Sequence, residues 1–105
     1  MKYDITPAFN KDYKRLPHEH RRLFRKAVFE QFLPALDAGA LAGAVPWPSR
    51  LRIHQLHTPL RQTVYSLTWN FASPDGRATF RLESTPDGPL LIWRRIGDHS
   101  IYTNP

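Results

Sequence analysis

Two Pro-Asp-Gly sequences, at residues 74–76 and 86–88, are the strongest constraint on what this chain can fold into. They separate runs rich in β-branched, aromatic and other apolar residues, which span residues 63–71, 77–84 and 90–96. Proline and glycine in adjacent turn positions favour tight reversals, and such apolar runs favour strands. The last part of the chain therefore predicts an antiparallel meander of consecutive strands joined by short turns.

The N-terminal part predicts a short strand and then a helix. Residues 2–6 are a strand candidate, and Thr6 followed by Pro7 is typical of a helix start, with a capping hydroxyl before a proline at the first helical position. Pro17 ends this helix. Its apolar stripe, at helical spacing, consists of Phe9, Tyr13 and Leu16.

A second, longer helix is predicted from about His18. Its broad apolar face is wide enough to lie on a sheet and on the first helix together. That face consists of Leu23, Phe24, Ala27, Val28, Phe32, Leu33 and Leu36. We expect Pro34 to kink or divide this helix, because proline removes a backbone hydrogen bond. Glycines and prolines in residues 37–48 then lead the chain out of helix.

From residue 50 the apolar pattern changes to a period of two. In residues 50–55 (RLRIHQ), Leu51 and Ile53 alternate with polar side chains, which predicts a strand. The polar side of this strand carries Arg50, Arg52 and His54. The chain is therefore expected to be one α+β domain, residues 1–105, with the order β-α-α-β-β-β. Its sheet is expected to be mainly antiparallel and four-stranded, with the two N-terminal helices on one face.

The absence of certain residues and motifs excludes several kinds of site and indicates where the protein is located. There is no cysteine, so disulfides, thiolate catalysis and cysteine zinc sites are ruled out. No HExxH motif, clustered carboxylates or glycine-rich phosphate loop is present, so neither a metal nor another cofactor is expected. The chain shows no secretory leader and no long apolar run, so it is expected in the cytoplasm, without a membrane partner.

The charge balance favours a polyanionic partner. The chain has 15 Lys+Arg and 9 Asp+Glu, a formal net charge of +6 and a pI of about 10.2. Residues 47–70 contain no acidic residue, although three arginines and two histidines lie there. Arginine binds phosphate through a planar, two-pronged fork. Nucleic acid, an acidic protein, or both are therefore the expected partners.

One sheet face is expected to gather the groups that metal-free cleavage of an RNA phosphodiester needs. Such cleavage requires a base for the 2′-hydroxyl proton, cations for the charged phosphorane and an acid for the leaving 5′-oxygen. Histidine changes its protonation near neutral pH and suits the first or third task. The candidate side chains for these tasks are His54, His57, His99 and Tyr102. The cations expected on this face are Arg50, Arg52, Arg77 and Arg81, with either Arg94 or Arg95 according to the register.

The predicted element order and four short motifs resemble the RelE/ParE superfamily of bacterial toxins. The motifs are F-x-K-x-x-x-x-L-P at residues 9–17, R-L-R-I at 50–53, D-G-R-A-T-F at 75–80 and I-W-R-R-I-G-D-H-S-I-Y at 92–102. The last two are typical of a RelE-like subgroup. The resemblance implies a RelE-like fold over essentially the whole chain. It also implies a toxin of a type II toxin–antitoxin system.

The resemblance also implies roles for individual residues. Arg52 and His54 match the basic pair that follows the helices, and because arginine is a poor proton acceptor, His54 is assigned as the base. Arg52 and Arg81 are assigned to charge stabilisation, His99 to the acid, and Tyr102 to acid/base chemistry or base stacking. The residues expected to bind RNA are Arg50, Arg61, Arg77, Arg94 and Arg95.

Three activities follow from the resemblance. The first is a metal-independent mRNA endoribonuclease that acts on translated mRNA at the ribosome, and the grouped arginine, histidine and tyrosine side chains favour it. The second is inhibition of DNA gyrase without nuclease chemistry, in the manner of the ParE branch. The third is an inactive regulatory member, which would be expected to lack Arg81 and His99. In each case the implied partner is a cognate antitoxin, through which alone the protein would contact operator DNA.

Overall fold

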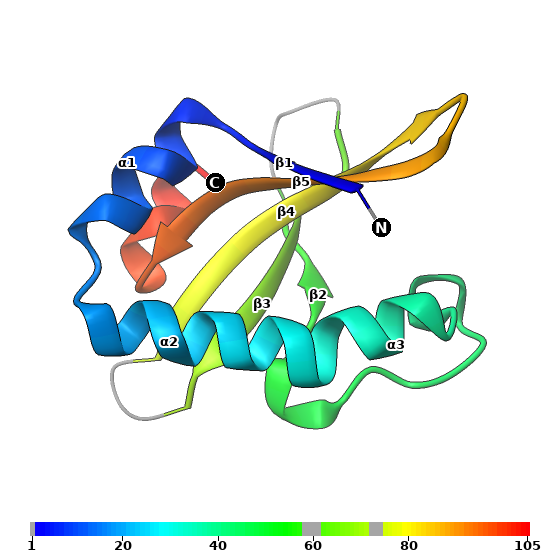
Figure 1. Ribbon diagram of the computed structural model, residues 1–105, viewed down its shortest axis with the longest axis horizontal. Helices are drawn as coiled ribbons and strands as arrows, with labels where there is room; N and C mark the ends of the chain where they lie inside the picture. The colour runs from blue at the N-terminus through cyan, green and yellow to red at the C-terminus, as the bar shows by residue number, and fades with distance from the viewer. Residues whose placement is uncertain (1, 58–61, 72–74) are drawn as a thin grey trace.

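The fold is organised around a five-stranded sheet with the strand order β1-β5-β4-β3-β2 (Figure 1). The computed structural model describes residues 2–57, 62–71 and 75–105. The strands are β1 (Lys2–Ile5), β2 (His54–Gln55), β3 (Tyr65–Asn70), β4 (Gly76–Thr85) and β5 (Gly88–Gly97). Strand β1 pairs parallel with β5, and the other pairs are antiparallel. The α+β class and the predicted meander, formed by β3, β4 and β5, are confirmed.

The predicted count of four strands in the sheet was wrong, because β1 and the four strands that follow the helices make five. The predicted strand over residues 50–55 is also shorter than expected. Ser49–Leu51 forms a 3₁₀ turn, in which the Leu51 N–H donates to the Pro48 carbonyl at 3.1 Å. Arg52 then takes a left-handed backbone conformation with φ 47°, which is uncommon for a residue other than glycine. Of the residues in this predicted strand, only His54–Gln55 pairs with β3.

Helix α1 (Pro7–Arg15) begins and ends as its sequence predicts. The Thr6 hydroxyl accepts the Phe9 N–H at 3.0 Å and donates to the Arg94 carbonyl at 2.7 Å. Thr6 therefore caps the helix and also ties its first turn to β5. Phe9 points into the core, 6.1 Å from the Trp93 ring.

The second predicted helix is divided by a π-helical turn ahead of Pro34. It consists of α2 (His18–Ala27), the π-turn η1 (Val28–Phe32) and α3 (Leu33–Asp37). At the end of η1 the Leu33 N–H donates to the Val28 carbonyl, five residues back. A proline in a regular α-helix clashes with the carbonyl four residues before it. The wider turn accommodates Pro34 there, and the helical segments run on across the sheet (Figure 1).

Aromatic rings fill the space between the helices and one sheet face, as predicted. Phe80 of β4 lies at the centre, with the Phe32 ring at 4.9 Å and the Trp93 ring at 5.6 Å. Phe24 of α2 packs against Trp93 at 5.1 Å. These contacts join α2, η1, β4 and β5 into one core, which fixes how the opposite sheet face is presented.

A β-bulge at Arg94 decides which way two neighbouring arginines point. Trp93 and Ile96 are both buried in the same core, although a regular strand would turn them to opposite faces. The pairing shifts there, with Thr79 opposite Arg95 and Phe80 opposite Trp93. The extra residue lets both arginines turn away from the core.

Replacing Gly76 by alanine is expected to destabilise the protein by about 1–3 kcal/mol, because a Cβ there overpacks a buried site. That Cβ would lie 2.5 Å from the Trp69 ring, which is only 2% exposed and so cannot swing away. Urea unfolding measures the loss. Gly97→Ala is the control, because its Cβ would meet Ile101 at 3.0 Å and cause a smaller loss. Equal losses would contradict the predicted clash at Trp69.

Candidate functional site

The sheet face opposite the helices was expected to be uncovered, but the C-terminal segment lies over part of it. This segment forms the 3₁₀ helix η4 (His99–Thr103) and runs on to residue 105. Its Ile101 is buried, and the Tyr102 hydroxyl is hydrogen-bonded to the buried hydroxyl of Ser66 on β3. We call residues 98–105 the tail. The tail brings two of the predicted site residues, His99 and Tyr102, onto the sheet.

Two predicted catalytic histidines lie around Tyr102, which is itself a predicted site residue. The His99 ring lies 4.6 Å from the Tyr102 ring, and the His54 ring lies 6.3 Å from it, edge to face. His54 reaches this position because β2 pairs it directly with Ser66. We call these four residues the tyrosine cluster. Both histidines are exposed, so a ligand can reach their rings.

Hydrogen bonding assigns the tautomer of His54. Its Nδ1 lies 2.8 Å from the main-chain carbonyl oxygen of Arg52. A carbonyl oxygen only accepts, so Nδ1 carries the proton and the neutral ring has an unprotonated Nε2. That nitrogen can take a proton, which is what the predicted base must do.

Arg81 and Arg94 supply positive charge on the same sheet face. The Arg94 guanidinium donates to the Pro105 carbonyl at 3.0 Å and to the Gln62 side-chain oxygen at 3.3 Å. Arg81 lies near the Glu83 carboxylate, at 3.8 Å. Burial and the neighbouring charge of Arg81 lower the pKa of Arg94 below its usual value. Two like charges held near each other favour an anion between them.

Arg52 and Arg77 point to the same carboxylate. Arg77 is buried, and it donates to the Thr68 hydroxyl at 2.7 Å and to Asp75 at 3.0 Å. Arg52 donates to the same Asp75 oxygen at 3.0 Å. This arrangement neutralises part of the expected basic face, and it directs the Arg52 and Arg77 guanidinium groups to Asp75.

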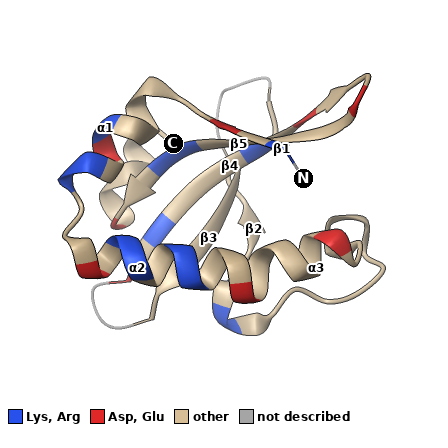
Figure 2. Ribbon diagram, viewed as in Figure 1, with Lys and Arg blue, Asp and Glu red and all other residues tan. Residues whose placement is uncertain are grey.

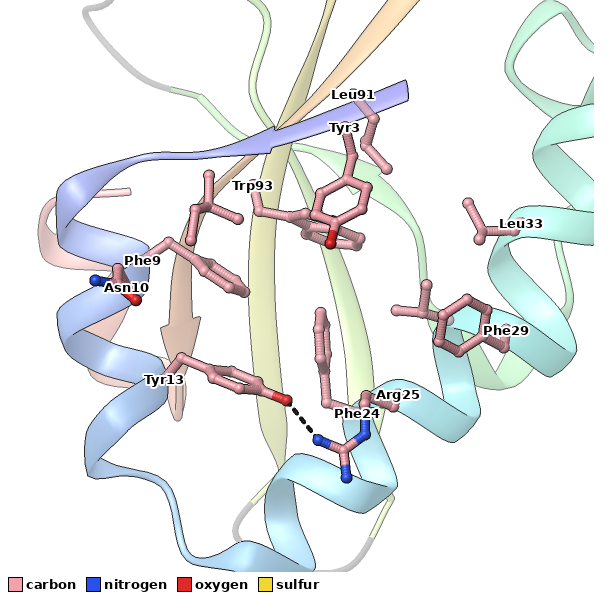
Figure 3. A pocket seen from close by; sticks show the side chains of 12 residues that line it. Tyr3, Phe9, Asn10, Tyr13, Phe24, Arg25, Phe29, Leu33, Leu91 and Trp93 are labelled. Atoms are coloured by element: carbon pink, nitrogen blue, oxygen red, sulfur yellow. Dashed lines mark hydrogen bonds between the residues drawn. The ribbon is translucent and has the colours of Figure 1, made fainter. Parts of the chain in front are cut away.

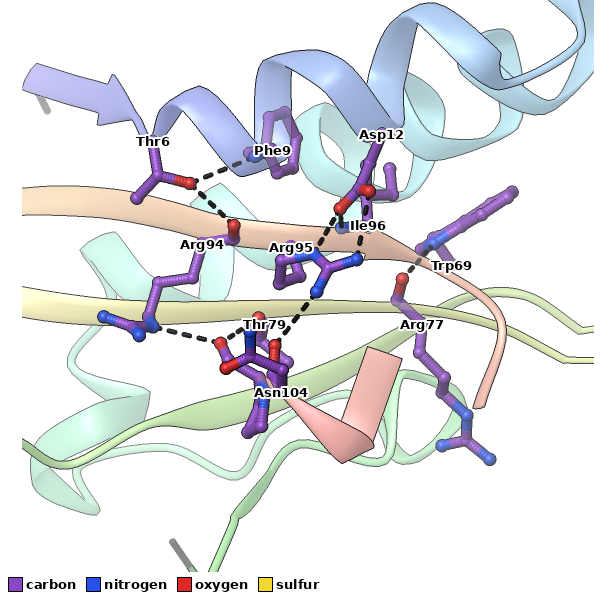
Figure 4. A network of polar contacts seen from close by, with 11 residues as sticks. Thr6, Phe9, Asp12, Trp69, Arg77, Thr79, Arg94, Arg95, Ile96 and Asn104 are labelled. Atoms are coloured by element: carbon purple, nitrogen blue, oxygen red, sulfur yellow. Dashed lines mark hydrogen bonds and ion pairs between the residues drawn. The ribbon is translucent and has the colours of Figure 1, made fainter. Parts of the chain in front are cut away.

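Arg50 and Arg95 also have partners away from the tyrosine cluster. The Arg50 guanidinium stacks 4.1 Å above the Phe71 ring. Arg95 forms a two-pronged ion pair with Asp12 of α1, at 2.6 and 3.1 Å (Figure 4). Arg61 lies outside the described residues. Figure 2 shows further cations on α1 and α2.

Sequence reasoning missed Ser66 and Asp12. Ser66 lies in a predicted strand, where a small polar residue on one face is ordinary, so it carries no distinguishing signal. The Thr79 hydroxyl donates to the Pro105 carbonyl at 3.2 Å. Asp12 lies 83 positions before the arginine that it binds, and no local pattern reports such a contact.

A second feature of the surface is an apolar groove between β1, α1 and α2 (Figure 3). It has a volume of about 270 Å³. Tyr3 and Phe29 line it and are 69% and 66% exposed, unusually high fractions for large apolar side chains. Arg25 donates to the Tyr13 hydroxyl at 3.0 Å across one end. The groove contains no acid/base pair, so it suits binding rather than chemistry.

Comparison with known proteins identifies the fold. No protein-family model matches the chain, and no curated protein matches it. A solved structure, the metal-bound toxin from Helicobacter pylori, is similar over 95% of this chain and 96% of that one, with a TM-score of 0.52 and 21% identity. In residues 2–57, 62–71 and 75–105 of the present chain, no three metal-ligating side chains come together, and no helix is long and apolar enough to cross a membrane. At 21% identity the similarity shows a shared fold, and the chain therefore has the fold of a bacterial toxin.

Proposed function

We propose that this protein is the toxin of a type II toxin–antitoxin system and a metal-independent endoribonuclease that cleaves translated mRNA at the ribosome. One observation carries the proposal: His54 and His99 both lie against Tyr102, on the sheet face that also holds Arg81 and Arg94. Cleavage of RNA through its own 2′-hydroxyl needs these groups. The fold shared with the Helicobacter pylori toxin supports the toxin role.

The proposed reaction begins at the unprotonated Nε2 of His54. This nitrogen removes the proton of the 2′-hydroxyl, and the 2′-oxygen then attacks phosphorus. Arg81 and Arg94 stabilise the charged phosphorane. The bond from phosphorus to the 5′-oxygen breaks, and His99 in its protonated form gives that oxygen a proton. The products are a 2′,3′-cyclic phosphate and a free 5′-hydroxyl.

The proposed partners follow from charge and exposed apolar surface. The net charge of +6 suits mRNA and the ribosome. A cognate antitoxin would inhibit the toxin and would itself bind operator DNA. The apolar groove offers this antitoxin a docking surface. We place this system in the cytoplasm, where translation occurs.

Induced expression in bacteria without the antitoxin, followed by mapping of RNA 5′ ends, tests the proposal. We expect growth arrest and new 5′ ends inside translated messages. Arg81→Ala is expected to lower cleavage by about 10²–10³-fold, as when one transition-state donor is lost. Arg22→Ala is the control, because this exposed arginine on α2 pairs only with Glu19 among the described residues.

Two outcomes would contradict the proposal. Growth arrest with intact RNA and damaged or relaxed DNA would support inhibition of gyrase instead. An absence of growth arrest from a folded, expressed protein would support an inactive regulatory member.

A further inference from the structure

The tail has little stability of its own. Its helix η4 has 5 residues and is of the 3₁₀ type, which is weak in isolation. The Asp98 carboxylate caps it by accepting the Ser100 N–H at 2.8 Å. Because η4 carries His99 and Tyr102, the contacts that fix the tail to the sheet decide where these two rings lie.

Arg95 joins the tail to helix α1 through its three donor nitrogens. Nε and one terminal nitrogen bind the two oxygens of Asp12 at 2.6 and 3.1 Å. The other terminal nitrogen donates to the main-chain carbonyl of Asn104 at 3.0 Å (Figure 4). Asp12 also accepts the Ile96 N–H at 3.2 Å. Asp12 therefore fixes the guanidinium of Arg95, and Arg95 binds the tail at Asn104. We call Asp12, Arg95 and the Asn104 carbonyl the tail latch.

The tail latch differs from an ordinary surface ion pair. The side chains of Asp12 and Arg95 are 12% and 25% exposed, so water screens them little. The hydrogen bond from Arg95 to Asp12 raises the pKa of Arg95, which keeps its charge fixed. A two-pronged Arg–carboxylate pair also sets the plane of the guanidinium, and so directs the other terminal nitrogen to Asn104.

We propose that Asp12 and Arg95 are positioning residues, which hold the tail so that His99 and Tyr102 face His54. This inference rests on the proposed nuclease function. Tyr102 is also held by Ser66, and the latch fixes the chain two residues further on, so that η4 is fastened at more than one point. With the latch open, the ring of His99 would be free to leave Tyr102. We do not assign Arg95 to RNA binding, because each of its three nitrogens already has a partner within the protein.

The decisive variant is Asp12→Asn, which removes the carboxylate and leaves Arg95 in place. We expect the kcat of RNA cleavage to fall by about 10²-fold, the cost of a misplacement near 1 Å, with KM almost unchanged. The opposite idea, that Arg95 binds RNA directly, predicts a lower KM and an unchanged kcat, because Arg95 released from Asp12 would bind RNA more tightly. Asp87→Asn is the matched control, because Asp87 pairs with Lys2 at 3.8 Å and both side chains are 79% exposed.

A spectroscopic readout separates this inference from the nuclease proposal. In the wild type, the Tyr102 ring at 4.6 Å should shift the NMR signals of the His99 ring protons, and the Asn104 amide should exchange slowly because it donates to Ile101 at 3.1 Å. Asp12→Asn should reduce the His99 shift and speed this exchange. Arg95→Lys should do the same while it keeps the positive charge, and it decides the question if Asp12→Asn does not fold.

Unchanged His99 signals and unchanged Asn104 exchange in folded Arg95→Lys would overturn the tail latch. A wild-type kcat of RNA cleavage in this variant would overturn it as well. If the wild type cleaves no RNA but both variants loosen the tail, the latch stands as a holder of His99 and Tyr102, and the nuclease proposal fails.

Discussion

Phe80→Ala is expected to lower the free energy of unfolding by about 3–5 kcal/mol, the usual cost of deleting a buried aromatic ring. Phe80 has 0% exposed surface, and three rings surround it: Phe32 at 4.9 Å, Tyr65 at 5.5 Å and Trp93 at 5.6 Å. Removing the Phe80 ring would leave a cavity that borders both η1 and β5. Neither element could fill this cavity without moving relative to the other. Urea unfolding followed by tryptophan fluorescence measures the change.

Phe29→Ala is the matched control for this measurement. It deletes the same ring from a side chain that is 66% exposed, so the expected loss is within about 0.5 kcal/mol. Similar losses for the two variants would mean that the aromatic core between η1 and β4 contributes no more than a surface ring. That result would contradict the packing described above.

His54→Ala is expected to lower the kcat of RNA cleavage by about 10²–10⁴-fold, the range for loss of a general base. The physical reason is the tautomer, because the bond from Nδ1 to the Arg52 carbonyl leaves Nε2 free to accept a proton. Single-turnover assays of the purified protein on ribosomes that carry a defined mRNA give the rate. Added imidazole should restore part of it, because the site of the missing ring is exposed to solvent.

His18→Ala is the control for His54→Ala. His18 is also exposed, but it begins α2 on the other side of the sheet, so its loss should leave the rate unchanged. A wild-type rate for His54→Ala would remove His54 from the mechanism. Equal losses in both variants would point to unfolding rather than to chemistry.

Local signals made much of the fold predictable. The start of α1 depends on adjacent residues, Thr6 and Pro7, whose preferences act without the rest of the chain. The break near Pro34 is equally local. The strand predicted over residues 50–55 failed because a few alternating residues fit a 3₁₀ turn as well as a strand. The position of β1 at the sheet edge, parallel to β5, follows from tertiary packing that no local pattern reports.

The candidate site was harder to predict. The alternating pattern indicates which sheet face the arginines occupy, but it does not indicate which carboxylates they bind. His54, His99 and Tyr102 do come together, because the pairing of β2 with β3 and the position of the tail bring them there. The arginines separate instead. Asp75 binds Arg77 two positions away and Arg52 from a different element, whereas Asp12 binds Arg95 from α1. Only three-dimensional contacts decide which cation stays available.

The bulge in β5 also affects how such a site could change in evolution. In a regular strand, only one of Arg94 and Arg95 would face the tail. The extra residue gives the two arginines different partners. Arg95 binds α1 and the tail, whereas Arg94 lies near Arg81. Substitutions at position 94 would therefore alter the charge offered to a ligand and the contact with Pro105, while the ion pair between Arg95 and Asp12 stays in place. One inserted residue thus allows the charge near Arg81 to change while Arg95 keeps the tail attached to α1.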